Sequence, residues 1–87
     1  MNRPPITIYT ASWCGYCQRA KRLLREKNLA FTEIDVESAP GLREEMMSRS
    51  QRRTVPQVFI GERHIGGSDE LLELERSGEL DRITQGD

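Results

Sequence analysis

The stretch Trp13–Cys17, which reads WCGYC, holds both cysteines of this 87-residue chain, with two residues between them. It follows a run of β-branched and aromatic residues, Ile6–Tyr9, and leads into a helix-like segment, Gln18–Asn28. A cysteine pair at this spacing, between a strand and a helix, is typical of thiol–disulfide redox chemistry. The sequence therefore predicts a reactive dithiol at the start of a helix.

The two cysteines are expected to have different roles because they occupy different places in the first turn. Cys14 should lie just before the turn, where unpaired backbone N–H groups and the positive end of the helix dipole favour a thiolate, the form that attacks disulfides. Cys17 should lie within the turn, close enough to its partner to close an internal disulfide. We therefore predict Cys14 as the nucleophile and Cys17 as the resolving thiol.

Two plainer interpretations of the cysteine pair stay open. The pair could be half of a zinc site, but zinc takes about four ligands, and the remaining soft ligand of the chain is its one histidine, His64. The cysteines could also be inert and buried. The glycine–aromatic interior of the motif and the strand and helix that flank it argue against inert cysteines.

The composition predicts one small soluble domain spanning residues 1–87. Apolar residues make up 36% of the chain and charged residues 31%, so a modest core under a charged surface is expected. The formal net charge of −1 predicts no general attraction to nucleic acid or to a membrane surface. No apolar run approaches the roughly 18 residues of a membrane-spanning helix, and Met1–Pro5 lacks the apolar segment of a signal peptide. Catalytic cysteines and a cytoplasmic location are therefore expected.

The order of the expected elements predicts the fold. A strand, a helix and a strand with short links imply parallel strands and a right-handed crossover, and Gly61-Glu62 is a two-residue turn that predicts a β-hairpin. The expected fold class is α/β, with a four-stranded mixed sheet flanked by helices on both faces. The expected elements are strand 6–9, helix 16–27, strand 31–36, a helix capped by Ser38 and ending near Ser50, strands 57–60 and 63–66, a helix from Ser68 to Ser77, and a last short turn around Leu80 and Ile83.

The spacing of apolar residues predicts which helix faces turn inward. In the first helix, Cys17, Leu23 and Leu24 fall on one stripe, and the charged residues, including Lys21, are expected to be solvated. Ser68 is expected to be the N-cap of the helix that follows the hairpin.

Three separated motifs together resemble those of the glutaredoxins, in particular the small, bacterial-type class with a two-cysteine site. They are Cys14–Cys17 (CGYC), Thr54–Ile60 (TVPQVFI) and Ile65–Asp69 (IGGSD). The resemblance implies the thioredoxin fold and glutathione as co-substrate. It also implies the reduction of glutathionylated proteins and of some protein disulfides, which are the expected partners.

The resemblance further implies where glutathione would bind. A cis proline at Pro56 would turn the backbone of Val55 toward the cysteine pair, to meet the cysteinyl part of glutathione like an added strand; a trans proline that opens the strand is the plainer alternative. The backbone of Ser68 would take the α-carboxylate and Asp69 would face the α-amino group, although both could simply cap a helix. The implied glutathione-binding residues are Tyr16, Arg43, Arg53, Thr54, Val55, Pro56, Gly67, Ser68 and Asp69.

Two positions depart from the commonest family pattern. Ala11 stands where members carry a lysine, so the cation for the glycyl carboxylate is expected from Arg43 and Arg53, which could also be merely solvated. Gly15 stands where the common motif has proline. Some relatives with glycine or serine there also assemble a 2Fe–2S cluster, which bridges two protomers through the first cysteine of each chain and two glutathiones.

These departures leave alternatives to a monomeric, glutathione-dependent oxidoreductase. One is a dimer bridged by a 2Fe–2S cluster, with Cys14 as a ligand, that acts as a carrier or sensor; the monomer by itself is expected to hold no metal. Trp13 also resembles the start of the thioredoxin motif, so a thioredoxin-like role is a third possibility. Tyr16 and the Gly66–Asp69 motif favour glutathione over a thioredoxin reductase as the electron donor.

Overall fold

The helices and strands follow the predicted order. The structure, a computed structural model, describes residues 3–85. None of the helices within that range has the length and apolar character that a membrane crossing needs. The elements are β1 (Ile6–Thr10), α1 (Gly15–Glu26), β2 (Thr32–Asp35), α2 (Leu42–Ser50), β3 (Gln57–Ile60), β4 (Arg63–Gly66), α3 (Ser68–Ser77) and α4 (Glu79–Thr84).

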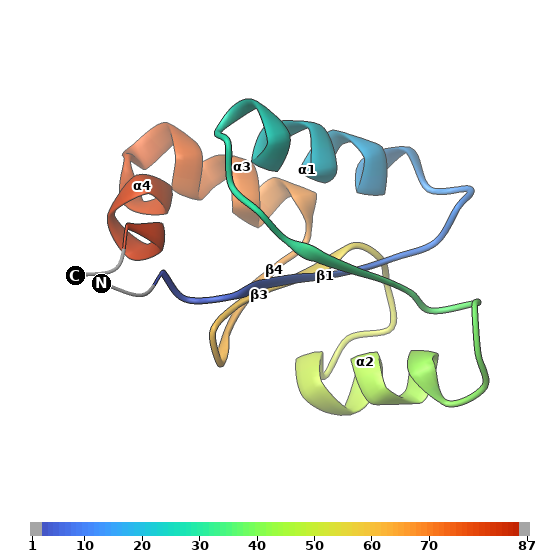
Figure 1. The fold of residues 1–87 in the computed structure, drawn as a ribbon. Helices are drawn as coiled ribbons and strands as arrows, with labels where there is room; N and C mark the ends of the chain where they lie inside the picture. The colour runs from blue at the N-terminus through green and yellow to red at the C-terminus, as the bar shows by residue number, and fades with distance from the viewer. Residues whose placement is uncertain (1–2, 86–87) are drawn as a thin grey trace.

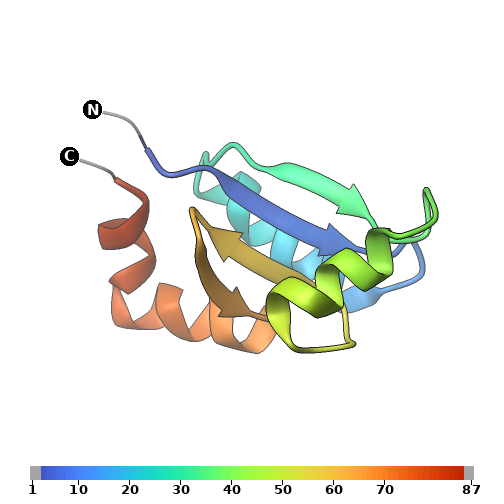
Figure 2. The ribbon, with the colours of Figure 1, turned by 90° about the horizontal axis from the view of Figure 1, so that it is seen from below.

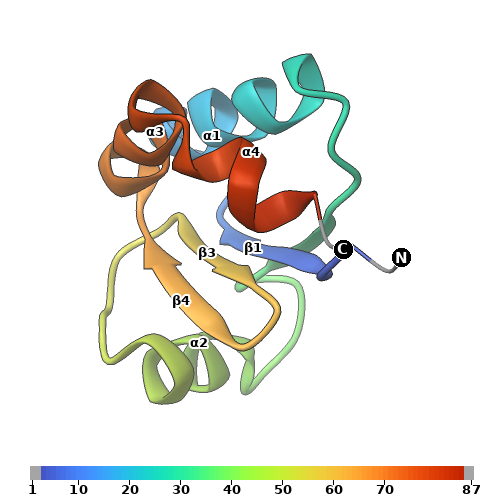
Figure 3. The ribbon, with the colours of Figure 1, turned by 90° about the vertical axis from the view of Figure 1, so that its left-hand side faces the viewer.

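The four strands form one mixed sheet in the order β2-β1-β3-β4 (Figure 2). Strand β1 runs parallel to β2 and antiparallel to β3, and β3 and β4 form the predicted antiparallel hairpin. Helices α1 and α3 lie on one face of the sheet and α2 on the other (Figures 1 and 3). The predicted four-stranded mixed sheet with helices on both faces is confirmed.

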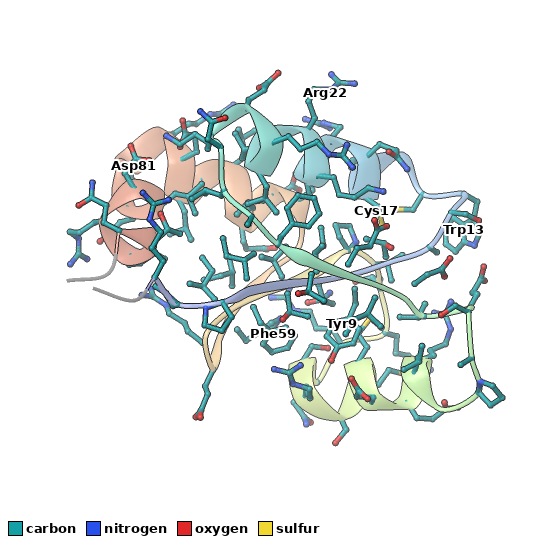
Figure 4. The ribbon with its side chains drawn as sticks, in the orientation of Figure 1. Tyr9, Trp13, Cys17, Arg22, Phe59 and Asp81 are labelled. Atoms are coloured by element: carbon teal, nitrogen blue, oxygen red, sulfur yellow. The ribbon has the colours of Figure 1, made fainter. Side chains whose placement is uncertain are left out.

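Side chains alternate across the central strands, so each face of the sheet has its own apolar core. On the side of α1 and α3, Ile8 and Val58 belong to one buried cluster with Leu24. On the side of α2, Tyr9 and Phe59 meet edge to face with ring centroids 5.9 Å apart, and Figure 4 shows both rings below the sheet. The first cluster fixes how α1 sits on the sheet, and hence where the cysteine pair lies.

Helix α2 begins later than predicted. Ser38 is not its N-cap: the helix starts at Leu42, after Gly41 in the left-handed conformation with φ 89°. The Ser38 hydroxyl instead donates a hydrogen bond to the Asp35 carbonyl at 2.7 Å, and the Ser38 N–H donates to the same carbonyl at 3.0 Å. Serine closes a turn after β2 here because its side chain can satisfy a nearby backbone group as readily as a helix end.

The N-cap of helix α3 differs from the predicted Ser68. Ser68 is the first helical residue, and Gly67 is the N-cap. The Glu70 carboxylate accepts a hydrogen bond from the Gly67 N–H at 2.6 Å. A glutamate at the third helical position thus bonds back to the N-cap N–H, which is one half of a capping box.

Lys21 is buried rather than solvated. It is 8% exposed, and its Nζ lies 2.9 Å from Glu33 Oε2. The helical pattern could not reveal this burial because the partner of the lysine stands on β2, outside the helix.

Candidate functional site

The two sulfurs lie at the first turn of α1, as predicted. Cys14 is the N-cap of the helix, and its Sγ accepts a hydrogen bond from the Cys17 N–H at 3.3 Å. The Cys14 N–H donates to the Ala11 carbonyl at 3.2 Å, which fixes the loop that delivers the pair. Both cysteines are free. The Cys14 sulfur therefore sits where a helix presents partial positive charge.

The two thiols differ in their access to solvent. Cys14 is 6% exposed and Cys17 is fully buried, between α1 and the sheet (Figure 4). Burial raises the pKa of Cys17 to about 12, because the low-polarity interior disfavours the thiolate. Cys17 is therefore held as a thiol, and Cys14 is the more accessible residue of the two.

The loop before β3 meets the dithiol with its backbone. The Val55–Pro56 peptide bond is cis, as the resemblance implied. The Cys14 Sγ lies 3.5 Å from the Val55 carbonyl oxygen, to which its thiol donates. Two segments 41 residues apart in the chain are thus in direct contact at the reactive sulfur.

A groove of about 380 Å³ begins beside this contact. Its volume falls within the range of small-molecule sites, which is roughly 300–1,000 Å³. The Cys14 sulfur contacts Val55, and Val55 is one of the residues that line the groove. Seven of the residues expected to bind glutathione are brought together around it. The lining residues are Tyr16, Arg52, Thr54, Val55, Pro56, Gly67, Ser68, Asp69 and Glu70.

The far wall of the groove is the turn that starts α3. Gly66 has φ +122°, and a Cβ added there would lie 2.7 Å from Glu70 Oε1, so a side chain would both strain the backbone and collide. A Cβ at Gly67 would lie 3.4 Å from the Pro56 carbonyl oxygen. The turn therefore packs closely against the proline loop and leaves the N-terminus of α3 facing the groove.

The groove carries charges of both signs. Glu70 Oε1 lies 3.5 Å from Arg52, and the hydrogen bond from the Gly67 N–H, with smaller help from Arg52, lowers the pKa of the Glu70 carboxyl. Asp69 adds a second acidic side chain to the same wall. Such a surface suits a zwitterionic ligand rather than an apolar one.

The two arginines predicted for the glycyl carboxylate do not line this groove. Arg43 pairs with Glu37 at 3.6 Å, and Glu37 also accepts a hydrogen bond from the Trp13 indole at 3.2 Å. Arg53 is exposed on the loop that leads to Val55. Arg52 is the arginine that the loop turns into the groove.

Ala11 is 1% exposed and belongs to the core on the side of α2. Its small side chain fills space between sheet and helix. The position at which the resemblance places a lysine is thus occupied here by a packing residue.

The sequence did not single out Arg52 and Glu70 as groove residues. Arg52 is adjacent to the predicted Arg53, and the direction of each side chain is set by the path of the loop, which no local pattern reveals. Glu70 had a usable signal, because a glutamate three residues after a helix N-cap often bonds back to the cap.

Metal ligands are not gathered anywhere in residues 3–85, where no group of three or more His, Cys, Asp or Glu residues could hold an ion. The sulfur of Cys14 is the one soft ligand of the site that approaches the surface.

Comparisons with known proteins point to one family. The family model described as Glutaredoxin matches residues 6–65. A glutaredoxin from Pseudomonas aeruginosa is 50% identical over 80 residues, which cover 92% of this chain and 95% of that protein. The solution structure of a glutaredoxin from Brucella melitensis has a TM-score of 0.85 at 47% identity, covering 98% of this chain and 92% of that one. The crystal structure of a buckwheat glutaredoxin–glutathione complex has a TM-score of 0.86 at 31% identity, covering 93% and 76%. The thioredoxin fold implied by the motifs is confirmed.

The difference in burial predicts selective alkylation. Iodoacetamide near neutral pH should modify Cys14 in the folded protein and spare Cys17, because Cys17 is buried and its pKa is raised to about 12. Peptide mass spectrometry after timed quenching measures both sites. In denaturant the two thiols should react at similar rates, which serves as the control; equal rates in the folded protein would contradict the assignment.

Proposed function

This chain belongs to the glutaredoxin family, and on that premise we propose that it is a glutathione-dependent thiol–disulfide oxidoreductase. Its substrates are protein–glutathione mixed disulfides and some protein disulfides. The observation that carries the proposal is the position of the Cys14 sulfur, at a helix N-terminus and 3.5 Å from the Val55 carbonyl at the edge of the groove.

The groove offers the γ-glutamyl and cysteinyl parts of glutathione partners of suitable chemistry. The N-terminal N–H groups of α3, beginning at Ser68, suit the γ-glutamyl carboxylate, and the Asp69 carboxylate suits the α-amino group. The backbone of Val55 would pair with the cysteinyl residue as an added strand does. That pairing would bring the glutathione sulfur to Cys14. Arg43 and Arg53 remain the proposed partners of the glycyl carboxylate.

Removal of glutathione from a protein needs Cys14 alone. Its thiolate attacks the glutathione sulfur of the mixed disulfide, a Cys14–glutathione disulfide forms, and the protein leaves as a thiolate that takes up a proton. A second glutathione thiolate then attacks the glutathione sulfur held on Cys14. Oxidised glutathione leaves and the Cys14 thiolate is restored.

Reduction of a protein disulfide uses both cysteines. Cys14 attacks one sulfur of the substrate and forms a mixed disulfide with the protein. Cys17 then attacks the Cys14 sulfur, the bond to the substrate breaks, and the substrate leaves with both of its sulfurs reduced. Two glutathione molecules reduce the Cys14–Cys17 disulfide that remains. The hydrogen bond from the Cys17 N–H to the Cys14 Sγ keeps the two residues in register for this step.

We place this activity in the cytoplasm and assign it to the monomer. Glutathione, the proposed electron donor, keeps thiols reduced in that compartment.

A second candidate function is that of a glutathione-ligated 2Fe–2S dimer, the alternative suggested by Gly15. A Cβ at Gly15 would meet no atom within 4 Å, so the space beside the cysteine pair is open. Trp13 and Tyr16, 67% and 58% exposed, flank Cys14 and form an apolar rim that a second copy could cover. A soft thiolate such as Cys14 is a suitable ligand for iron in such a cluster.

Substitution of each cysteine separates the two reactions. Cys14→Ser should lower every activity by several orders of magnitude, since it removes the nucleophile. Cys17→Ser should retain deglutathionylation of a small mixed disulfide and lose the reduction of protein disulfides. Both activities are measured as the consumption of NADPH when glutathione reductase reduces the oxidised glutathione that they produce. If Cys17→Ser lost both activities equally, the assigned roles would be wrong.

Charge removal tests the proposed cation for the glycyl carboxylate. Arg43→Gln and Arg53→Gln should each raise the KM for glutathione about fivefold, the effect of losing roughly 1 kcal/mol in an exposed ion pair. Arg22→Gln is the matched control, because Arg22 carries the same charge on α1 and points away from the rest of the molecule (Figure 4). An increase seen with Arg52→Gln, and with neither proposed arginine, would transfer the role to the arginine in the groove.

The cluster candidate has a direct readout. Anaerobic reconstitution with iron, sulfide and glutathione should give a brown species of twice the monomer mass if the candidate is right, and Cys14→Ser should abolish the colour. Absorption spectra with size-exclusion chromatography make the measurement. A protein that stays colourless and monomeric with glutathione present removes the candidate and leaves the oxidoreductase.

A further inference from the structure

An ion pair beside the buried thiol has no part in the reactions above. Lys21 of α1 lies 2.9 Å through its Nζ from Glu33 Oε2 of β2. The Thr10 hydroxyl, at the end of β1, donates to the same Glu33 oxygen at 2.7 Å. The lysine side chain is 11% exposed and the glutamate side chain 37%, so the cation is the more deeply placed partner.

The register of the sheet explains why these groups meet. Ile8 of β1 stands opposite Glu33 of β2, so their side chains share the face that α1 covers. Lys21 is one of the buried residues of α1, together with Cys17 and Leu24. Desolvation of an ammonium group is unfavourable, and an apolar side chain of similar length could fill this space. The buried charge therefore invites a functional explanation.

Cys17 and Lys21 are neighbours on the buried face of α1. Residues four apart on a helix have Cβ atoms about 5–6 Å apart. Burial is the main cause of the raised pKa of Cys17, whereas a hydrogen bond with the Ala11 backbone and, more weakly, the Lys21 ammonium act in the opposite direction. Cys14 also faces Cys17 and raises its pKa, while Arg25 faces Glu33 from the same helix.

Glu33 is ionised at neutral pH and holds the cation in place. Hydrogen bonds from Thr10 and then from Lys21 lower the pKa of the Glu33 carboxyl. Thr10 precedes Ala11, whose carbonyl accepts the Cys14 N–H at 3.2 Å. The strand that anchors the ion pair thus continues directly into the loop that delivers the dithiol.

We propose that Lys21 is a positioning residue for the resolving step, in which its ammonium stabilises the negative charge that develops on the Cys17 sulfur, while Glu33 and Thr10 hold that ammonium in place. The inference rests on the proposed function. In the step itself the Cys17 thiol gives its proton to water and its sulfur bonds to the Cys14 sulfur. The bond from Cys14 to glutathione or to the substrate protein breaks, and the leaving thiolate takes up a proton from water. Attack by Cys14 on a mixed disulfide does not require Cys17 to ionise, so the effect is specific to the dithiol reaction.

The closing step can be timed directly. The reduced protein is mixed with oxidised glutathione and quenched with acid, and mass spectrometry separates the Cys14–glutathione adduct from the internal disulfide. Lys21→Gln should slow conversion of the adduct about three- to fourfold for a rise of one unit in the pKa of Cys17, because the thiolate fraction falls tenfold while the nucleophilicity of the thiolate increases. The pH at which the closing rate increases should move upward. Lys21→Arg, which keeps the charge, should restore most of the rate.

Glu33→Gln distinguishes an electrostatic role from a structural one. The glutamine carbonyl can still accept from Lys21 and Thr10, but the negative charge that opposes the Lys21 ammonium is gone. The pH at which the closing rate rises should therefore be lower than in the unsubstituted protein. In Lys21→Gln that pH should be higher. This measurement stands even if Lys21→Gln fails to fold, which thermal unfolding by circular dichroism would reveal.

Lys27→Gln is the matched control for loss of a paired lysine. Lys27 bridges to Glu75 and Asp81 at the other end of α1, so its loss should lower the melting temperature without moving the pH profile of closing. Closing rates that fall equally in Lys21→Gln and Glu33→Gln, or pH profiles that coincide with that of the unsubstituted protein, would overturn the inference. Failure of the unsubstituted protein to form any adduct with glutathione would instead overturn the proposed function.

Discussion

The seating of α1 on the sheet is the constraint on which the redox site depends. The buried stripe that contains Leu24 packs against Ile8 and Val58 and fixes the rotation of the helix about its axis. Because Cys17 lies on that stripe, Cys14 must fall three residues earlier, at the N-cap, where its sulfur accepts the Cys17 N–H. One residue of helix corresponds to a rotation of about 100°. A slip of one residue in the packing would therefore carry Cys17 out of the core and undo the difference between the thiols.

The two thiols differ because they lie at the same helix end but in different environments. The interior raises the pKa of Cys17 to about 12 and keeps it a neutral thiol, whereas Cys14 sits at the rim beside the Val55 carbonyl. An interior thiol is protected from reagents that do not pass through Cys14. Under the proposed function, it would react once a mixed disulfide on Cys14 presents a sulfur to it. Burial would then set the order of the two attacks, and the Lys21 ammonium would favour the second.

The sequence was sufficient for the order of elements because period-two alternation and the Gly61-Glu62 turn are local signals, as is the cysteine pair before a helix. The start of α2 was misplaced because the Ser38 hydroxyl donates a hydrogen bond to the Asp35 carbonyl in a turn and does not cap the helix. The sequence does not distinguish these two roles of a serine. Lys21 was misplaced for a different reason. A charged residue among other charged residues on a helix predicts solvent, and its burial depends on Glu33, which only the pairing of β2 with β1 brings near.

The groove could be predicted from motifs, and the contacts between those motifs explain why the motifs occur together. Val55 touches the Cys14 sulfur, and a Cβ at Gly67 would lie 3.4 Å from the Pro56 carbonyl oxygen. The dithiol, the proline loop and the start of α3 therefore form a continuous series of contacts in which each segment is a wall for the next. A cysteine pair alone specifies a helix end with a nucleophile. The other two motifs place a shaped and charged surface beside Cys14, which under the proposed function would restrict the disulfides presented to it.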